Sequence, residues 1–380
     1  MGTSGFCSFP KCKCYYDKEE QITSIDTESD AIKDNNEISL DSFLLLIPDN
    51  IKKEMESEKE FFENQQNNSV IKTIKIKDND SLDNKEIFYH GEFNENNEKD
   101  GIGKMIIMNE KDEKIIYHGI WVKNQLIKGI IYYPNINAKY KGEIKNFVKN
   151  GKGIYTSETE IYEGNWNDDK KDGEGLLKFK EGIIYKGSFK NDKLNGKGEM
   201  KWPNNTYYVG EFSNNLFDGN GYLKGSNGNT YKGNFRKGVY NGEGEFKWVK
   251  GIKTAVYKGN YSWGKKDGKG QLSFENGNSY TGCWESGLPI GEGIFETKNR
   301  KYYGNWRGGV FLQLIKSVKK EGCQEENINL NFTTPIEDIE IKGPFKFSNN
   351  SVYSSNYING YNILFYFLIF CLCKTINIII

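Results

Sequence analysis

The chain repeats one short pattern, most regularly from Tyr162 to Phe295: Tyr-x-Gly-x-aromatic, followed by Gly-x-Gly. Counted from each tyrosine, glycines recur at positions +2, +11 and +13, and copies start every 22 to 28 residues. A fixed period of this length indicates a stacked array of repeats. Seven copies carry all three glycines, and they start at Tyr140, Tyr162, Tyr185, Tyr208, Tyr231, Tyr257 and Tyr280; looser copies start at Tyr89, Tyr117 and Tyr302.

Within each copy the residues alternate with a period of two, which is typical of half-buried β-strands. Turn residues such as Asn191-Asp192 and Asn214-Asn215 stand between the two alternating segments, and Asn-Gly pairs lead to the next copy. Asn-Gly between extended segments is a strong hairpin signal. Each copy therefore predicts one β-hairpin.

Glycine inside a strand costs about 0.5–1 kcal/mol relative to alanine. We attribute these glycines to aromatic rings of the neighbouring strand, which can lie over a glycine because it has no Cβ. On this hypothesis Phe189 and Phe235 are candidate covers for Gly210. The residues that define the central repeats are Tyr162, Gly164, Trp166, Gly173, Gly175, Tyr185, Gly187, Phe189, Gly196, Gly198, Tyr208, Gly210, Phe212, Gly219, Gly221, Tyr231, Gly233, Phe235, Gly242 and Gly244.

The pattern resembles the MORN repeat, which is written Tyr-x-Gly-x-Trp/Phe followed by Gly-x-Gly. The resemblance covers about residues 89–309. It implies an all-β fold, an elongated single-layer antiparallel sheet of stacked β-hairpins, and a place beside membranes or cytoskeleton. The copy at Tyr117 departs from the pattern, because Lys128-Gly129-Ile130 replaces Gly-x-Gly, and the copy at Tyr302 stops after Trp306. We expect a distorted hairpin at the first and an end cap at the second.

The balanced net charge hides a split along the chain. Residues 1–88 carry 11 basic and 19 acidic side chains, whereas residues 89–309 carry 35 and 27. We predict that residues 1–88 form an acidic, largely disordered leader, with a helix from Asp49 to about Phe62 that folds onto the sheet through Ile51 and Met55. Residues 70–76 alternate loosely and predict a first strand.

The N-terminus is a candidate acylation site. Gly2 is a candidate myristoyl acceptor, although Phe6 stands where the usual motif has Ser or Thr, and Cys7, Cys12 and Cys14 are candidate palmitoyl acceptors. A tail with incidental thiols is the alternative. The seven cysteines form no disulfide framework and residues 1–30 lack a secretory signal, so we expect a cytoplasmic protein, at a membrane face or on cytoskeleton.

The segment after Trp306 changes pattern. The spacing of Val310, Phe311, Leu314, Ile315 and Val318 predicts a capping helix over residues 310–322, ending near Gly322. Residues 323–380 form a polar tail that ends in an apolar run of eleven residues, Ile363–Cys373. That run is shorter than the roughly 20 residues that span a bilayer. A membrane anchor, a buried tail and a translation of AT-rich non-coding sequence remain open for it.

No arrangement of residues in the sequence predicts catalysis, a metal or a cofactor. The two histidines, His90 and His118, each follow a repeat tyrosine, and we expect both at exposed strand positions. The Gly-x-Gly motifs lie inside predicted strands, so they are not phosphate-binding loops. We therefore predict a protein that is not an enzyme and holds no cofactor.

Lysines recur at equal repeat positions on the face opposite the aromatic residues. Position +16 holds Lys178, Lys201, Lys224 and Lys247, and position +1 adds a second set. A basic row could meet anionic lipid or acidic filaments, although Glu174, Glu211 and Glu243 share that face and lysine also favours solubility. Nucleic acid is disfavoured because the aromatic residues belong to the repeat's packing.

We conclude from the sequence that the chain is a non-catalytic structural scaffold, which links protein partners of a membrane or cytoskeletal complex. The first alternative is an acylated peripheral membrane tether that binds anionic phospholipid. The second is a regulatory module of an enzyme bound in trans. The ends of the predicted sheet also offer surfaces for homo-oligomers.

Overall fold

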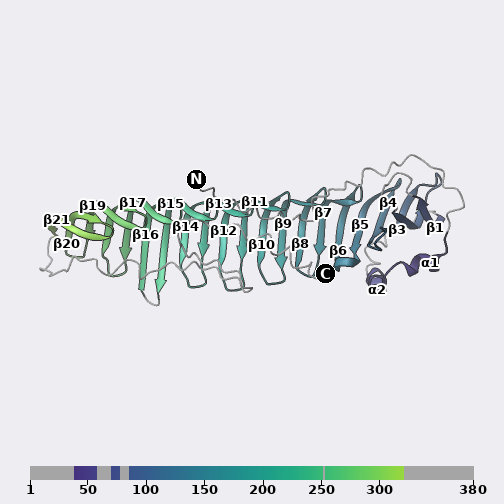
Figure 1. Ribbon diagram of the computed structural model, residues 1–380, viewed down its shortest axis with the longest axis horizontal. Helices are drawn as coiled ribbons and strands as arrows, with labels where there is room; N and C mark the ends of the chain where they lie inside the picture. Colours follow the sequence, from purple (N-terminus) through teal and green to yellow (C-terminus); the bar gives the residue numbers. More distant parts are fainter. Residues whose placement is uncertain (1–37, 58–69, 78–84, 251–252, 321–380) are drawn as a thin grey trace, which may run out of the picture. The chain divides into compact units, whose positions relative to one another are not determined.

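The computed structural model of the protein describes residues 38–57, 70–77, 85–250 and 253–320 (Figure 1). Among these residues 21 strands and two short α-helices form, and the strands build open antiparallel sheet, which confirms the all-β prediction. The chain divides into two compact units. The described part of the first comprises residues 38–57, 70–77, 85–135 and 144–148, and that of the second comprises residues 136–143, 149–250 and 253–320.

The first unit pairs its five strands in sequence order. The predicted first strand is present as β1. Two helices precede it, and the Ser39 side chain caps the first of them by accepting a hydrogen bond from the Ser42 backbone N–H at 3.1 Å. The elements are α1 (Leu40–Leu45), α2 (Asp49–Ser57), β1 (Val70–Lys77), β2 (Glu86–Phe93), β3 (Lys99–Met108), β4 (Lys114–Val122) and β5 (Gln125–Tyr133).

The two helices cover one face of the sheet in the first unit. This confirms the fold-back predicted for the helix that begins at Asp49, whereas α1 is not predicted by the sequence pattern. Phe43, Ile51 and Met55 are buried against an apolar cluster on the strands. Ile106 and Ile116 are fully buried in that cluster, and they lie on the face that the repeat tyrosines do not use. This packing gives two short helices the apolar contact that they could not supply alone.

The second unit is a single layer in which β7 to β21 pair in sequence order (Figure 1). A 3-10 turn (Pro134–Ile136) precedes β6. The strands are β6 (Ala138–Lys145), β7 (Val148–Thr156), β8 (Glu160–Asn167), β9 (Lys170–Phe179), β10 (Ile184–Lys190), β11 (Lys193–Lys201), β12 (Tyr207–Ser213), β13 (Leu216–Lys224), β14 (Thr230–Arg236), β15 (Val239–Lys250), β16 (Lys253–Ser262), β17 (Lys265–Phe274), β18 (Ser279–Glu285), β19 (Leu288–Glu296), β20 (Arg300–Arg307) and β21 (Val310–Lys319).

From the copy at Tyr117 onward, the turn inside each repeat has two residues with positive φ, which is the type I′ geometry that matches strand twist. Asn191 and Asp192, at φ 47° and 63°, form one such turn. The turn also joins neighbouring repeats: the Asp192 backbone N–H donates to the Lys171 carbonyl at 3.0 Å, and the Asp192 carboxylate accepts from the Lys171 N–H at 2.8 Å. Successive hairpins are therefore bonded at their turns as well as along their strands.

Each repeat tyrosine is the centre of its hairpin. Tyr185 is fully buried, its hydroxyl donates to the Ser188 carbonyl at 2.9 Å, and its ring meets Phe189 and Phe212 edge-on at 5.1 Å. Phe212 belongs to the next repeat, so the edge-on contacts run from one repeat to the next. Edge-on pairs of this kind add about 0.5–1.5 kcal/mol each beyond the area they bury.

In the regular repeats the glycines at +2 and +13 both meet the tyrosine of their own repeat. For Gly210 this corrects the prediction that Phe189 or Phe235 covers it, whereas Gly221 on β13 does lie under a ring of the neighbouring strand, that of Tyr208 on β12. A Cβ on Gly210 would lie 2.6 Å from both the Asn220 carbonyl oxygen and the Gly221 Cα, and against the Tyr208 hydroxyl. For a Cβ on Gly221 the three nearest atoms all belong to Tyr208, with Cε2 at 2.6 Å. Glycine is required at +11 for a different reason. Gly219, for example, has φ 99°, a backbone conformation that residues with a side chain rarely adopt.

Residues 310–319 form strand β21, so the predicted capping helix is wrong. β21 pairs along β20, and Phe311 places its ring where a Cβ on Gly304 would stand. The apolar spacing that suggests a helix includes residues that stay half-exposed on the strand, such as Leu314 and Ile315. Pairing with β20 and the ring over Gly304 outweigh that weak helical pattern, and the copy at Tyr302 thereby becomes a complete hairpin.

Candidate interaction surface

The lysines at +16 lie in one row, because strand register aligns them. Lys178 and Lys201 both pair with Ile184, Lys201 and Lys224 both pair with Tyr207, and Lys224 and Lys247 both pair with Thr230. We call this set the lysine row. In order across the strands it contains Ile161, Lys178, Ile184, Lys201, Tyr207, Lys224, Thr230, Lys247 and Val256.

The lysine row faces away from the buried rings and is accessible. The four lysines are exposed, and Ile161 and Ile184 keep 43% and 38% of their surface exposed. Lysines recur on every second strand, so they stand about 10 Å apart, given a strand spacing of about 4.8 Å. The row therefore alternates positive charge with apolar or hydroxyl-bearing side chains.

One of the four lysines has an acidic neighbour of its own. The Lys201 ammonium lies 2.8 Å from the Glu199 carboxylate, and this hydrogen bond raises the pKa of Lys201. Both side chains are largely exposed, so the pair contributes little to stability. Within the described ranges, Lys178, Lys224 and Lys247 have no ion pair, so their charge faces solvent.

The parallel row at +1 carries both signs of charge. Lys186 pairs with Glu199, and Lys258 lies 2.9 Å from Glu245. Glu174, Glu211 and Glu243 share this face, as the sequence predicts, but they lie in a third row. There they are in register with Ser188, Lys197 and Asn260. That row is four residues from the lysine row, roughly 13 Å along the strand. At this distance salt largely screens it, since the screening length is about 8 Å in physiological salt.

A further position matters that the sequence pattern did not reveal: the ninth residue after a repeat tyrosine, here called the cover position. In four repeats its side chain lies on the tyrosine ring from the opposing strand. Phe217 stacks on Tyr208 at 3.8 Å and Tyr240 stacks on Tyr231 at 3.9 Å. In register with the aromatic residue at +4, the position holds Leu126, Lys171, Leu194, Phe217, Tyr240, Lys266, Pro289 and Phe311. Alignment of the copies would have found it, although its residue type varies.

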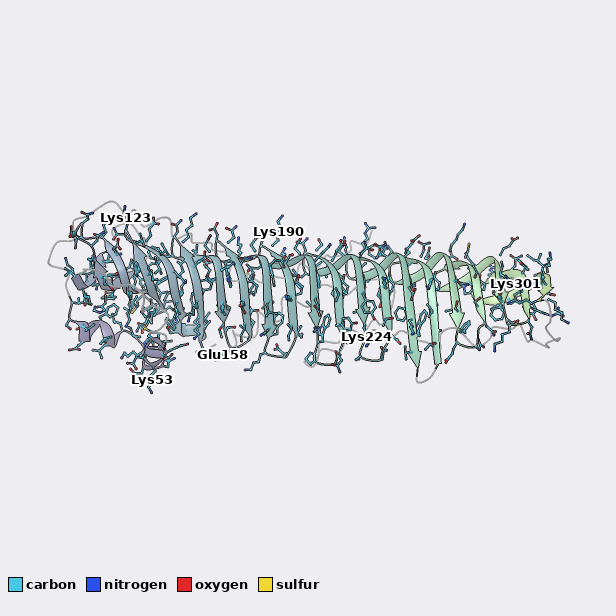
Figure 2. All side chains as sticks on the ribbon, turned by 180° about the vertical axis from the view of Figure 1, so that it is seen from behind. Lys53, Lys123, Glu158, Lys190, Lys224 and Lys301 are labelled. Atoms are coloured by element: carbon cyan, nitrogen blue, oxygen red, sulfur yellow. The ribbon has the colours of Figure 1, made fainter. Side chains whose placement is uncertain are left out.

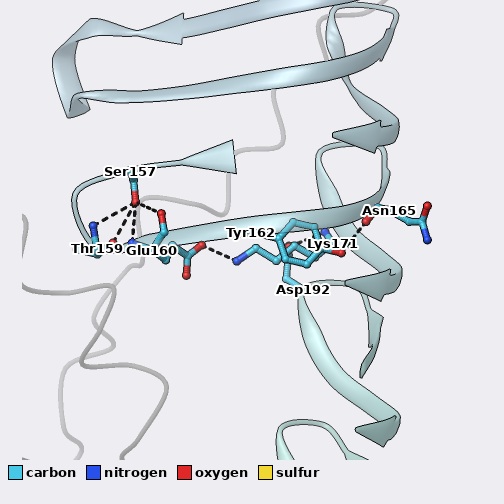
Figure 3. A network of polar contacts seen from close by, with 7 residues as sticks. All are labelled: Ser157, Thr159, Glu160, Tyr162, Asn165, Lys171 and Asp192. Carbon is cyan, nitrogen blue, oxygen red and sulfur yellow. Dashed lines mark hydrogen bonds and ion pairs between the residues drawn. The ribbon is translucent and has the colours of Figure 1, made fainter. Parts of the chain in front are cut away.

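Where the cover residue is lysine, its ammonium sits over aromatic rings. Lys171 lies 5.3 Å from the Tyr162 ring centre and 2.5 Å from the Glu160 carboxylate, in the network that Figure 3 shows. The Lys266 ammonium lies within 4.7 to 5.6 Å of three ring centres, and burial lowers its pKa to about 8. Ring faces favour a cation, so these lysines belong to the packing and not to the accessible surface.

The histidines differ from their predicted exposure. His118 is 5% exposed and burial lowers its pKa to about 3; His90 bonds Thr73 at 2.7 Å and lies 5.6 Å from the Phe43 ring. The physical reason is the helix pair, which covers in the first unit the face that stays open in the second.

Among the described residues no cluster of metal-binding side chains occurs, and no helix there is long and apolar enough to cross a membrane. Gly2, Cys7, Cys12, Cys14 and the segment 363–380 lie outside the described residues.

Stacked hairpins with an open, patterned face define a β-hairpin repeat protein. A family model described as the MORN repeat matches residues 140–159, 162–183, 185–207, 208–230, 231–253 and 257–279. Residues 140–279 therefore contain six MORN repeats, and such repeats are typically protein- or membrane-interaction modules. A comparison with curated proteins finds no match.

The structure adds hairpins of the same kind outside the matched residues. A Cβ on Gly293 would lie 2.7 Å from the Tyr280 hydroxyl, and one on Gly103 would lie 2.6 Å from the Tyr89 ring carbon Cζ. The tyrosine–glycine arrangement therefore extends over the copies that start at Tyr89 and Tyr280. In the copy at Tyr117, Gly119 still pairs with Gly129, and the irregular step falls between Ile120 and Trp121.

Proposed function

We propose that this protein is a non-catalytic scaffold whose second unit binds an acidic protein surface through the lysine row. The observation that carries the proposal is the register that places Lys178, Lys201, Lys224 and Lys247 on one exposed line. Evenly spaced charges on a rigid sheet match a partner with evenly spaced acidic groups, and they raise the association rate as well as the affinity. Such a partner is a component of a cytoplasmic membrane or cytoskeletal complex.

The composition of the surface favours a protein partner over a lipid bilayer at this face. Glu199 and Glu245 stand in the row beside the lysines and would repel anionic headgroups. Tyr207 in the lysine row lies 5.6 Å from the ring of Tyr222, and tyrosine is enriched at protein interfaces. Mixed charge with half-buried tyrosine and exposed isoleucine is the chemistry of a protein contact surface.

Proximity labelling with a matched pair of variants tests the proposal. The row variant changes Lys178, Lys201, Lys224 and Lys247 to Gln. The control variant changes four other exposed lysines of the same unit, Lys152, Lys190, Lys197 and Lys269, to Gln, so both lose equal charge. We expect a set of neighbouring proteins that the wild type and the control variant label and the row variant does not. Identical labelling by all three proteins would contradict the proposal.

A further inference from the structure

One hairpin turn of the second unit holds a residue that its backbone disfavours. Trp263 and Gly264 form the turn between β16 and β17, with φ 48° and 83°. The same first position holds Asp168, Asn191, Asn214, Lys237 and Ser286 in other repeats. Asn and Asp tolerate this left-handed backbone, whereas a bulky side chain there is a conformational outlier. The hairpin itself therefore gives no reason for a tryptophan.

Trp263 is also set apart by its exposure. All seven tryptophans of the chain are described, and Trp263 is the exposed one, with 46% of its surface accessible. Trp121, Trp166, Trp248, Trp284 and Trp306 are each 5% exposed or less, and Trp202 is intermediate. Strain together with exposure of a large ring points to a role outside the fold.

The surroundings of Trp263 are mainly cationic. The Arg236 guanidinium lies 5.7 Å from the ring centre, and Arg236, Lys237 and Lys265 are exposed around the turn. The nearby carboxylates of Asp218 and Asp267 accept hydrogen bonds from the backbone N–H groups of Lys237 at 3.0 Å and Ser286 at 3.5 Å. Glu285 is exposed at the next turn. One cation therefore lies by the ring and two more are exposed at this turn and the one before it, against one exposed acidic side chain at the turn that follows.

We propose that the Trp263 turn is a contact site for an anionic lipid bilayer. The indole ring enters the headgroup region, where amphipathic rings are favoured, and Arg236, Lys237 and Lys265 meet the phosphates. The site is distinct from the lysine row. The turns lie along one edge of the second unit, where Lys190 is labelled in Figure 2, and the lysine row lies toward the opposite edge, where Lys224 is labelled. One edge would then contact the bilayer while the other binds a protein.

Vesicle binding by the full chain, made in bacteria so that its N-terminus is not acylated, tests the site. Vesicles contain phosphatidylcholine with about one-third phosphatidylserine. We expect the wild type to sediment with them and to lose tryptophan fluorescence when the lipids carry brominated acyl chains. The Trp263→Phe variant should bind without that loss of fluorescence. Absence of wild-type binding, or fluorescence unchanged by bromine, overturns the proposal.

A second variant separates binding from folding. Trp263→Asn places the preferred residue in the turn, so its melting temperature should equal or exceed that of the wild type while vesicle binding falls several-fold. The matched control, Ser286→Asn, changes the same position of the next repeat and should bind as the wild type does. Equal binding by Trp263→Asn, or a clear loss of its stability, contradicts the assignment. The row variant should keep vesicle binding, so failure here is distinguishable from failure of the proposed scaffold function.

Discussion

The ring of Tyr208 occupies the space that a side chain on Gly221 would need, with its Cε2 atom 2.6 Å from the Cβ position. We predict that Gly221→Ala destabilises the protein by about 1–3 kcal/mol, the usual cost of overpacking. Because the nearest atoms to that Cβ all belong to Tyr208, Tyr208→Leu should relieve part of this cost. Thermal or urea unfolding of both single variants and the double variant measures the coupling.

Gly210→Ala is the control for this cycle. Its Cβ would meet the Asn220 carbonyl oxygen and the Gly221 Cα, which cannot move aside without breaking the sheet. Gly210→Ala should therefore show little relief from Tyr208→Leu, and none from Phe189→Leu or Phe235→Leu. Equal relief at Gly210 and Gly221 would contradict this account of the two glycines.

The buried tyrosines predict a loss of stability at alkaline pH. Burial raises the pKa of Tyr185, Tyr208 and Tyr231 well above their ordinary value of 10.0. Above about pH 10 the unfolded chain releases these protons and the folded chain retains them, so the free energy of unfolding falls as pH rises. Urea midpoints at pH 7, 9, 10 and 11 should show this decline, and Tyr231→Phe should make it shallower. Urea midpoints that stay constant from pH 7 to pH 11 would contradict the burial of these tyrosine hydroxyls.

The cover position should accept a cation. Phe217→Lys should cost less stability than Phe217→Gln, by about 0.5–1 kcal/mol, because the face of the Tyr208 ring attracts an ammonium. Lys171 and Lys266 already fill this position in other repeats. Urea unfolding of the two variants at low and moderate salt measures the difference. Equal stability of the Gln and Lys variants would contradict an attraction between the Tyr208 ring face and the lysine ammonium.

Strand β21 should protect its backbone amides from hydrogen exchange. Residues 310–319 pair with β20, and Phe311 fills the space over Gly304. Phe311→Ala should leave that space empty and speed exchange in β20 and β21, with little effect on β8 and β9. Hydrogen exchange followed by mass spectrometry resolves the two regions. Fast exchange over 310–319 in the wild type would contradict the strand.

Much of this structure follows from spacing alone, since a hairpin needs only alternation and a turn. Tyr185, Gly187 and Gly198 recur at fixed offsets, so the strands, the I′ turns and the alignment of the lysine row were predictable. The helix predicted over 310–322 fails because its apolar spacing is ambiguous over one short segment, and pairing with β20 decides the outcome. Burial of His118 was not predictable, because it depends on two helices far away in the sequence.

The features missed at the surface are differences between copies, not the shared pattern. The cover position varies between Lys171, Phe217 and Tyr240, so no single residue type marks it. Trp263 stands where other repeats place Asn, Asp, Lys or Ser, and the positive φ and the exposure show that it is unusual. A repeat pattern predicts what the copies share, and departures from it need coordinates to be interpreted.

The central claim is that the lysine row, and not the total charge of the protein, binds acidic partners. Elution from immobilised polyglutamate in a salt gradient tests it most directly, with the wild type, the row variant and the charge-matched control variant. The account predicts that the row variant elutes at clearly lower salt than the control variant, because ordered charges act together on one partner surface. Elution of the two variants at the same salt concentration would contradict it.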